Sequence, residues 1–338
     1  MTVPVSATPS ELPAATRRKV TDIFTRDEIR LLTERSDAMG FVAVGRTWLV
    51  ITATLAMLAW ASQLSPAYAV PLFVSGFIIL GGRHLALAIL MHEASHATLF
   101  RTRWLNDTFA DWVCAKPIWN SVHRYRAHHF VHHTKTGQPE DTDLSLVTGL
   151  PCSRASLWRK FARDLSGLTG IKFLFGRLLM DAGVLKWTVS NDVVKLPQDG
   201  RRWFDYPRDL LRNAAGAALV NGLLFALCWL AGYPWLYACW VLSYITPFPL
   251  FLRIRSMAEH ACTENSPDMF RNTRTTRAGL LARMTVAPIH VNHHIEHHVM
   301  ASVPWFRLPL MHRLLRERGA VAEPPGYLDV LKTVSSLS

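Results

Sequence analysis

The 338-residue sequence is poor in cysteine and contains no pair of cysteines at the spacing of a metal or redox motif. Its five cysteines include no CxxC motif, and Cys228 and Cys239 lie inside hydrophobic runs. A disulfide framework, a zinc–thiolate site and an iron–sulfur cluster are therefore excluded as organising features. The first twelve residues also lack the apolar core of a secretory signal peptide, and their Pro, Ser and Thr content predicts a mobile start.

Charge is scarce as well, because only 18% of the residues are Asp, Glu, Lys or Arg. Four apolar blocks carry almost none of it, with Arg83 as the one charged interruption; they cover residues 48–61, 70–91, 214–231 and 235–252. A helix that crosses a bilayer needs roughly 20 mostly apolar residues. The sequence therefore predicts an all-α membrane protein with four transmembrane helices, arranged as two hairpins.

The positive charges indicate the orientation of these hairpins. All 37 Lys and Arg residues lie outside the hairpin tips, 62–69 and 232–234, which carry no charge of either sign. Positive residues are retained on the cytoplasmic side, so we expect both termini and the active site to be cytosolic, in a bacterial inner membrane. Anionic lipid headgroups account for the net charge of +12, and no nucleic-acid partner is expected.

This pattern also divides the chain. We expect a mobile or interfacial N-terminal segment over 1–40 and one membrane domain over 41–338. Within that domain, 92–213 and 253–338 should form a cytosolic helical cap.

The most informative residues are the 15 histidines, most of which occur in three short runs. The runs are HEASH at 92–96, HHFVHH at 128–133 and HHIEHH at 293–298. Helix positions i, i+3 and i+4 share a face, so eight imidazoles should face one another; they are His92, His96, His129, His132, His133, His294, His297 and His298. So many imidazoles together are stable when neutral and bound to a metal, and the cap is predicted to hold one.

Two other classes of protein share parts of this pattern. His92-Glu93-Ala94-Ser95-His96 fits the HExxH motif of zinc proteases, with Glu93 as the base. An intramembrane protease would leave the second and third runs without a role. A histidine-rich metal transporter would need ionisable groups inside its spans, where the sequence has only Arg83 and His84.

With its three ordered histidine boxes, the sequence resembles the membrane fatty acid desaturase superfamily. The flanking segments also match, in LMHEASHATLF, RYRAHHFVHHTKTGQPEDTDL and VNHHIEHHVMASVPWFRLPLMH. The segment RSMAEHA resembles a family segment whose histidine completes the site, which adds His260. The resemblance thus implies nine ligands for two iron ions, with O2 as co-substrate.

Further residues near the boxes are candidates for orienting these ligands. The candidates are His128, His293, Glu140, Asp141, Asp143, Glu259, Glu296 and Ser256. Helical phase turns His128 and His293 about 100° away from the ligand face. Ser256 stands where some family members have an Asn that reaches a metal through water, and His293 stands where an aromatic residue is common.

The resemblance also implies the reaction. We expect an oxidoreductase that introduces a C=C bond into a lipid acyl chain, with a hydroxylase or ketolase of the same superfamily as the alternative. No cytochrome b5-like HPGG segment is present, so the electrons should come from an external ferredoxin, rubredoxin or cytochrome. The basic and apolar segment 157–187 should lie on the membrane surface and cover the site.

Overall fold

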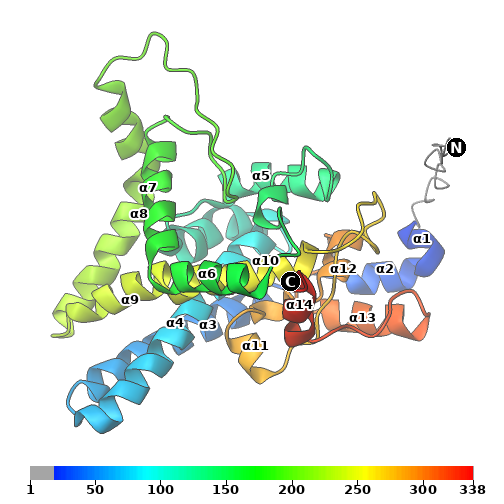
Figure 1. Ribbon diagram of the computed structural model, residues 1–338, viewed down its shortest axis with the longest axis horizontal. Helices are drawn as coiled ribbons and strands as arrows, with labels where there is room; N and C mark the ends of the chain where they lie inside the picture. Colours follow the sequence, from blue (N-terminus) through cyan, green and yellow to red (C-terminus); the bar gives the residue numbers. More distant parts are fainter. Residues whose placement is uncertain (1–18, 338) are drawn as a thin grey trace, which may run out of the picture.

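The computed structural model describes residues 19–337, which form helices and loops with only isolated β-bridges and no strand. This confirms the all-α prediction (Figure 1). Residues 1–18 of the expected N-terminal segment lie outside the described part. The rest of that segment forms α1 (Val20–Ile23), α2 (Arg26–Leu32) and the first residues of α3 (Asp37–Ala61). Leu32 of α2 packs into a buried apolar cluster with residues of α13 (Leu308–Glu317).

Four helical segments are long and apolar enough to cross a bilayer, as an integral membrane protein requires. Helix α3 (Asp37–Ala61) pairs with α4 (Pro66–Ser95), and α8 (Asp205–Leu230) pairs with α9 (Trp235–Ile245), which leads into α10 (Pro247–His260). Figure 1 shows the tips of both hairpins at the left, away from the cap. The two predicted hairpins are therefore present.

All four helical segments extend beyond the apolar blocks of the sequence, as α3 and α4 illustrate. Helix α3 begins at Asp37, where the Ser36 hydroxyl accepts a hydrogen bond from the Met39 amide at 3.3 Å and caps the helix. Helix α4 continues at its C-terminal end past its apolar run to Ser95. A membrane helix thus delivers His92 directly to the cap.

The fourth apolar block, predicted as one run, is broken in the structure. Thr246 has φ −113° and ψ −80°, and Pro247 and Pro249 follow it. Proline supplies no amide hydrogen, so the helical hydrogen bonds of α9 end there and α10 begins as a separate helix. Helix α10 then packs on α4, where a Cβ on Gly81 would lie 2.7 Å from Pro247 Cγ.

Arg83 and His84, which interrupt the second apolar block, hold elements together. The buried His84 Nε2 lies 3.1 Å from both the Trp240 carbonyl oxygen and Ser243 Oγ, which ties α4 to α9. Arg83 donates to the Met284 carbonyl oxygen at 2.9 Å. Both residues therefore have a packing role.

The cap consists of shorter helices that gather around the ends of α4 and α10. They are α5 (Val122–Lys135), α6 (Arg154–Leu165), α7 (Leu168–Asp181), α11 (Leu280–Met284), α12 (His294–Val299), α13 and α14 (Tyr327–Val334). Helices α6 and α7 are separated by Gly167, whose φ of +84° favours glycine. They fall in the segment expected to cover the site, and α7 does border the cavity described below.

Candidate metal centre

Two long helices, α4 and α10, and two cap helices, α5 and α12, bring the nine predicted ligand histidines together in two adjacent groups. The first group contains His92, His96, His129, His133 and His297, and the second contains His132, His260, His294 and His298. Within each group, one donor nitrogen from every residue lies within 4.8 Å of all the others. The structure therefore places every histidine of the predicted set, and no other, in these two groups.

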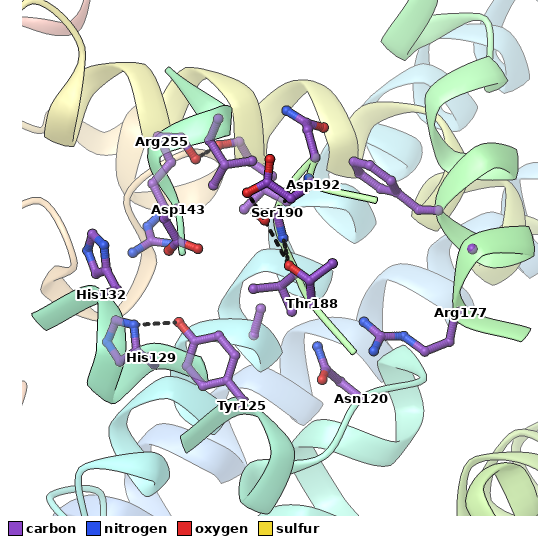
Figure 2. Close-up of a pocket in the computed structure, with 18 of the residues that line it drawn as sticks. Asn120, Tyr125, His129, His132, Asp143, Arg177, Thr188, Ser190, Asp192 and Arg255 are labelled. Carbon is purple, nitrogen blue, oxygen red and sulfur yellow. Dashed lines mark hydrogen bonds between the residues drawn. The ribbon is translucent and has the colours of Figure 1, made fainter. Parts of the chain in front are cut away.

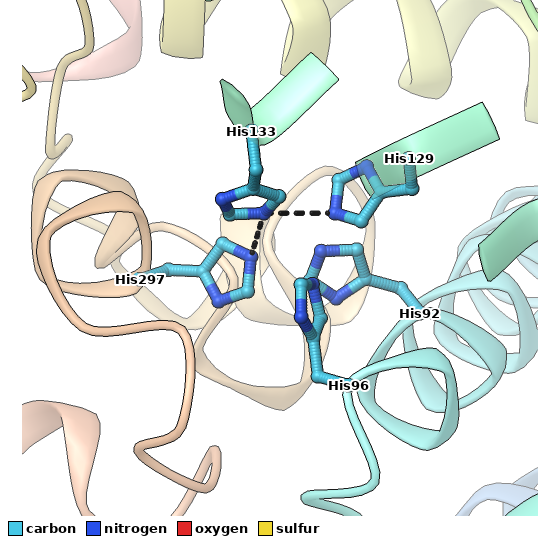
Figure 3. A group of neighbouring side chains, drawn as sticks. All are labelled: His92, His96, His129, His133 and His297. Atoms are coloured by element: carbon cyan, nitrogen blue, oxygen red, sulfur yellow. Dashed lines mark hydrogen bonds between the residues drawn. The ribbon is translucent and has the colours of Figure 1, made fainter. Parts of the chain in front are cut away.

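In the first group, the imidazoles of α4, α5 and α12 converge on one point (Figure 3). His133 Nε2 lies 3.0 Å from His129 Nε2 and 3.0 Å from His297 Nε2. The ring centroids of His92 and His96 are 4.9 Å apart, and that of His92 is 4.5 Å from that of His129. Residues more than 200 positions apart thus share one site.

The second group is formed by α5, α10 and α12. His294 Nε2 lies 2.8 Å from His260 Nε2 and 3.0 Å from His298 Nε2. The His132 ring faces those of His260 and His298, with centroids 4.8 and 5.0 Å away. The groups adjoin, because the His133 ring of the first stacks at 4.3 Å on the His298 ring of the second.

Helical spacing explains how each H-x2-HH run serves both groups. On α5, the i and i+4 residues His129 and His133 enter the first group, whereas His132, one position earlier than His133, enters the second. On α12 the same rule sends His294 and His298 to the second group and His297 to the first. A one-residue step rotates a side chain by about 100°, so each short helix can contribute to two sites.

The donor geometry fits metal ions. Two nitrogens bound at right angles to one metal, each about 2.1 Å from it, lie about 3.0 Å apart, which matches the 2.8–3.0 Å separations between Nε2 atoms. Within residues 19–337, the Nε2 atoms of His92 and His96 are buried and have no hydrogen-bond partner. A buried polar atom without a partner is costly, and a bound metal would remove that cost.

Burial keeps most of these imidazoles neutral, as metal binding requires. Desolvation, reinforced by neighbouring imidazoles, holds the pKa of His129, His297 and His298 well below the usual range. For His96, burial lowers the pKa to about 3. His132 differs: burial opposes its charge, but the hydrogen bond to Asp141 and nearby carboxylates raise its pKa.

Asp141 is placed to orient His132. His132 Nδ1 donates to Asp141 Oδ1 at 2.7 Å, and the amides of Gly137 and Asp143 donate to the two Asp141 oxygens, each at 2.9 Å. This contact fixes the ring with its Nε2 atom available to the second group. The candidate Asp143 lies nearby but bonds chiefly to His128 Nε2, at 2.9 Å.

Two other carboxylates lie beside ligand histidines. Glu259 Oε1 accepts from Arg255 at 2.7 Å and is 3.5 Å from His294 Nδ1. Glu93 Oε1 is 3.4 Å from His92 Nδ1, while its Oε2 accepts from Thr98 and from the Trp305 amide. Sequence reasoning did not include Glu93 among the residues expected beside the ligands, because its position next to His92 gives no helical-face signal.

The remaining candidates do not contact the nine histidines. Glu140 is exposed, and Ser256 Oγ donates to the Leu252 carbonyl oxygen of its own helix. Glu296 accepts from Thr275 at 2.6 Å and from His312 at 2.7 Å, and His293 lies with them. These carboxylates were proposed to orient ligand imidazoles, but Glu296 instead orients a histidine outside both groups.

A cavity of about 160 Å³ opens beside the two groups (Figure 2). Its inner end includes His129, His132, His260 and His294. Its walls are largely apolar, formed by α4, α10, α7 and the loop after α7; they include Met91, Leu146, Phe173, Met180, Tyr244 and Phe248. The arrangement places a largely apolar, partly open chamber next to the candidate metal positions.

The chain is similar to known proteins over most of its length. The family model described as fatty acid desaturase matches residues 68–327. A dihydrorhizobitoxine desaturase of Bradyrhizobium elkanii is 24% identical over 91% of this chain and 82% of its own length. An sn-1 acyl-lipid omega-3 desaturase (ferredoxin) of Nostoc sp. is 24% identical over 74% of this chain and 68% of its own length. A zeaxanthin 4-ketolase of Chlamydomonas reinhardtii is 26% identical over 88% of this chain and 59% of its own length.

Proposed function

Because the chain belongs to the fatty acid desaturase family, which implies an oxidoreductase, we propose that it is an O2-dependent di-iron desaturase that introduces a C=C bond into an acyl chain. One observation carries the proposal: nine imidazoles form two adjacent groups, and four of these imidazoles line a largely apolar cavity. A histidine-rich transporter would instead need ionisable groups inside its spans, where the sequence has only Arg83 and His84.

The nine histidines would hold two iron ions, one in each group. Bound iron would supply the O2 chemistry that removes hydrogen from an unactivated C–H bond. Neutral imidazoles suit iron, and the all-nitrogen donor set leaves the centre cationic. Asp141 and Glu259, which contact His132 and His294, would offset part of this charge.

The other residues position the substrate and exclude water. Met91, Phe173 and Phe248 line the cavity with apolar surface, which favours a hydrocarbon segment beside the histidines. Asp141 holds His132 in a fixed orientation through a hydrogen bond, whereas Glu93 only places a carboxylate oxygen 3.4 Å from His92 Nδ1. A rigid site of this kind keeps the reacting C–H bond at one distance from the metal positions.

The membrane setting completes the proposal. We place the protein in a bacterial inner membrane, with both termini and the cap on the cytosolic side, because the hairpin tips are uncharged. The two electrons come from a separate ferredoxin, rubredoxin or cytochrome. The Nostoc relative, whose name specifies ferredoxin, favours the first of these.

Expression in a host that lacks the activity, followed by mass spectrometry of its lipids, tests the reaction. New double bonds support desaturation, whereas new hydroxyl or keto groups would support the alternative that the ketolase relative suggests. Metal analysis tests the site separately. Two irons per chain are expected, with one lost in His132→Ala and one in His297→Ala; a single zinc retained in both variants would contradict the proposal.

The protease alternative receives no support from the geometry. Glu93, which would have to activate water, is buried, and its Oε2 already accepts two hydrogen bonds. His92 and His96 share their site with three further imidazoles rather than with a single additional ligand. A protease site would leave a coordination position open to water.

A further inference from the structure

Arg177, a half-buried cation in the cavity wall, has no ion pair within residues 19–337, unlike the two arginines near it. Arg255 donates to Glu259 at 2.7 Å, and Arg124 donates to Asp181 at 2.6 Å. Among the described residues, Arg177 has no ion pair and no hydrogen bond, and its Nη1 atom is buried without a partner. Burying a charge without a partner is costly, so this arrangement calls for an explanation.

The carboxylates of the same cavity do not fill this role. Asp143 is bonded to His128 at 2.9 Å, and Glu259 is bonded to Arg255. Asp192 is exposed and accepts from Ser190. Asp181, which acts on Arg177 at longer range, is hydrogen-bonded to Arg124. The guanidinium of Arg177 therefore keeps its hydrogen-bond donors for a group that enters the cavity.

The surroundings hold this guanidinium in place. Its Cζ atom lies 4.8 Å from the centre of the Trp187 ring, a cation–π contact that fixes one face of the group. Figure 2 shows Arg177 on the side of the cavity opposite His129 and His132, with Asn120 next to it. A stacked guanidinium is pre-organised to donate two parallel hydrogen bonds from its edge.

The chamber between the two ends is small. Its volume of about 160 Å³ is close to that of a cavity of about 150 Å³ that holds benzene. A group bound by Arg177 and a C–H bond at the histidines would therefore belong to one compact substrate, or to one end of a longer one.

We propose that Arg177 binds an anionic oxygen group, a carboxylate or a phosphate, of the molecule whose C–H bond is oxidised at the histidine groups. This inference rests on the proposed function for the identity of that bond. It assigns the substrate class: an acyl compound with a free acid or phosphorylated end, in contrast to a neutral ester or a carotenoid.

Binding to the iron-loaded full-length protein in detergent, without an electron donor, tests the proposal. Three probes share one chain: dodecanoate, methyl dodecanoate and dodecyl phosphate. The wild type should bind at least one anionic probe about tenfold or more tightly than the ester, as expected for a charge-assisted hydrogen bond. The better of the two anions identifies the head group as carboxylate or phosphate.

Arg177→Gln should lose that preference and bind the anion about as weakly as the ester, and Arg177→Lys should fall between the two. Arg163→Gln is the matched control, because it removes the same charge from an exposed position on α6. Equal affinity of the wild type for ester and anions would overturn the proposal even if Arg177→Gln failed to fold. So would an unchanged preference in a folded, iron-replete Arg177→Gln protein.

The two proposals can fail separately. If the protein prefers anions through Arg177 but oxidises no C–H bond with any donor, the anion site is supported and the desaturase function is refuted. Equal oxidation of acid and ester by both wild type and Arg177→Gln would refute only the anion site.

Discussion

Asp141→Asn is the most direct test of how the second histidine group is built. In the wild type, Asp141 accepts one hydrogen bond from His132 and one each from the Gly137 and Asp143 amides. An asparagine keeps one acceptor oxygen but presents an NH2 group in place of the other. If that NH2 group faced the Gly137 amide, Gly137 would lose its acceptor. Whichever way the asparagine side chain turns, the negative charge of the group that accepts from His132 is lost.

The size of the effect follows from these contacts. A hydrogen bond to a charged group contributes about 1.5–3 kcal/mol, and about 1.4 kcal/mol corresponds to a factor of ten in affinity. Loss of the contact behind a metal-binding histidine commonly lowers metal affinity about 10- to 100-fold. We therefore expect iron in the second group to bind about 10- to 100-fold more weakly, with the first group little changed.

A chelator titration of the purified iron-loaded protein measures this effect. Asp141→Asn should release one of two irons at a chelator concentration about 10- to 100-fold lower than the wild type does, and the second iron at the wild-type concentration. Glu140→Gln, at the exposed neighbouring position, is the matched control and should behave as wild type. A single release of both irons at the wild-type concentration from folded Asp141→Asn would refute the reasoning.

Three further predictions follow from the same contacts. His133→Ala should retain one iron per chain and His128→Ala two, by metal analysis, because only His133 belongs to a histidine group. Gly176 lines the cavity, and a Cβ there would meet no atom within 4 Å. Gly176→Leu should therefore block the cavity and abolish product formation in the lipid assay, with both irons retained. Loss of iron in this variant would contradict a purely blocking effect. Removal of iron by chelation should lower the melting temperature, because a metal that binds only the folded chain stabilises it. An unchanged melting temperature would argue against metal binding by the folded chain.

Much of the fold was readable from the sequence because it depends on local patterns. Uncharged apolar blocks predicted the hairpins, and the spacing of the histidine runs placed eight imidazoles on facing surfaces. His260 came only from the family resemblance, since a lone histidine has no periodic partner. Its ligand role, like those of the other eight, stays a prediction, although the structure places all nine together.

The features that escaped prediction depend on contacts between distant segments. The amide that fixes Glu93 belongs to Trp305, 212 positions later in the chain. The division of each histidine run between two groups depends on how α5 and α12 face each other, which the spacing of one helix does not contain. Arg177 is unusual only because the nearby carboxylates are already paired, and that can be judged only once all partners are known.

The break between α9 and α10 and the length of α4 have a consequence for the protein's environment. His92 belongs to the first group and lies near the end of a helix that starts at Pro66, and His260 belongs to the second group and ends α10. A bilayer thinner or thicker than the apolar length of such helices changes their tilt. Lipid thickness would then shift His92 and His260 relative to the six ligand histidines on α5 and α12, so the surrounding membrane would affect the geometry of the metal centre. Activity in bilayers of defined acyl length should pass through an optimum, whereas iron content, which depends on contacts within each group, should not.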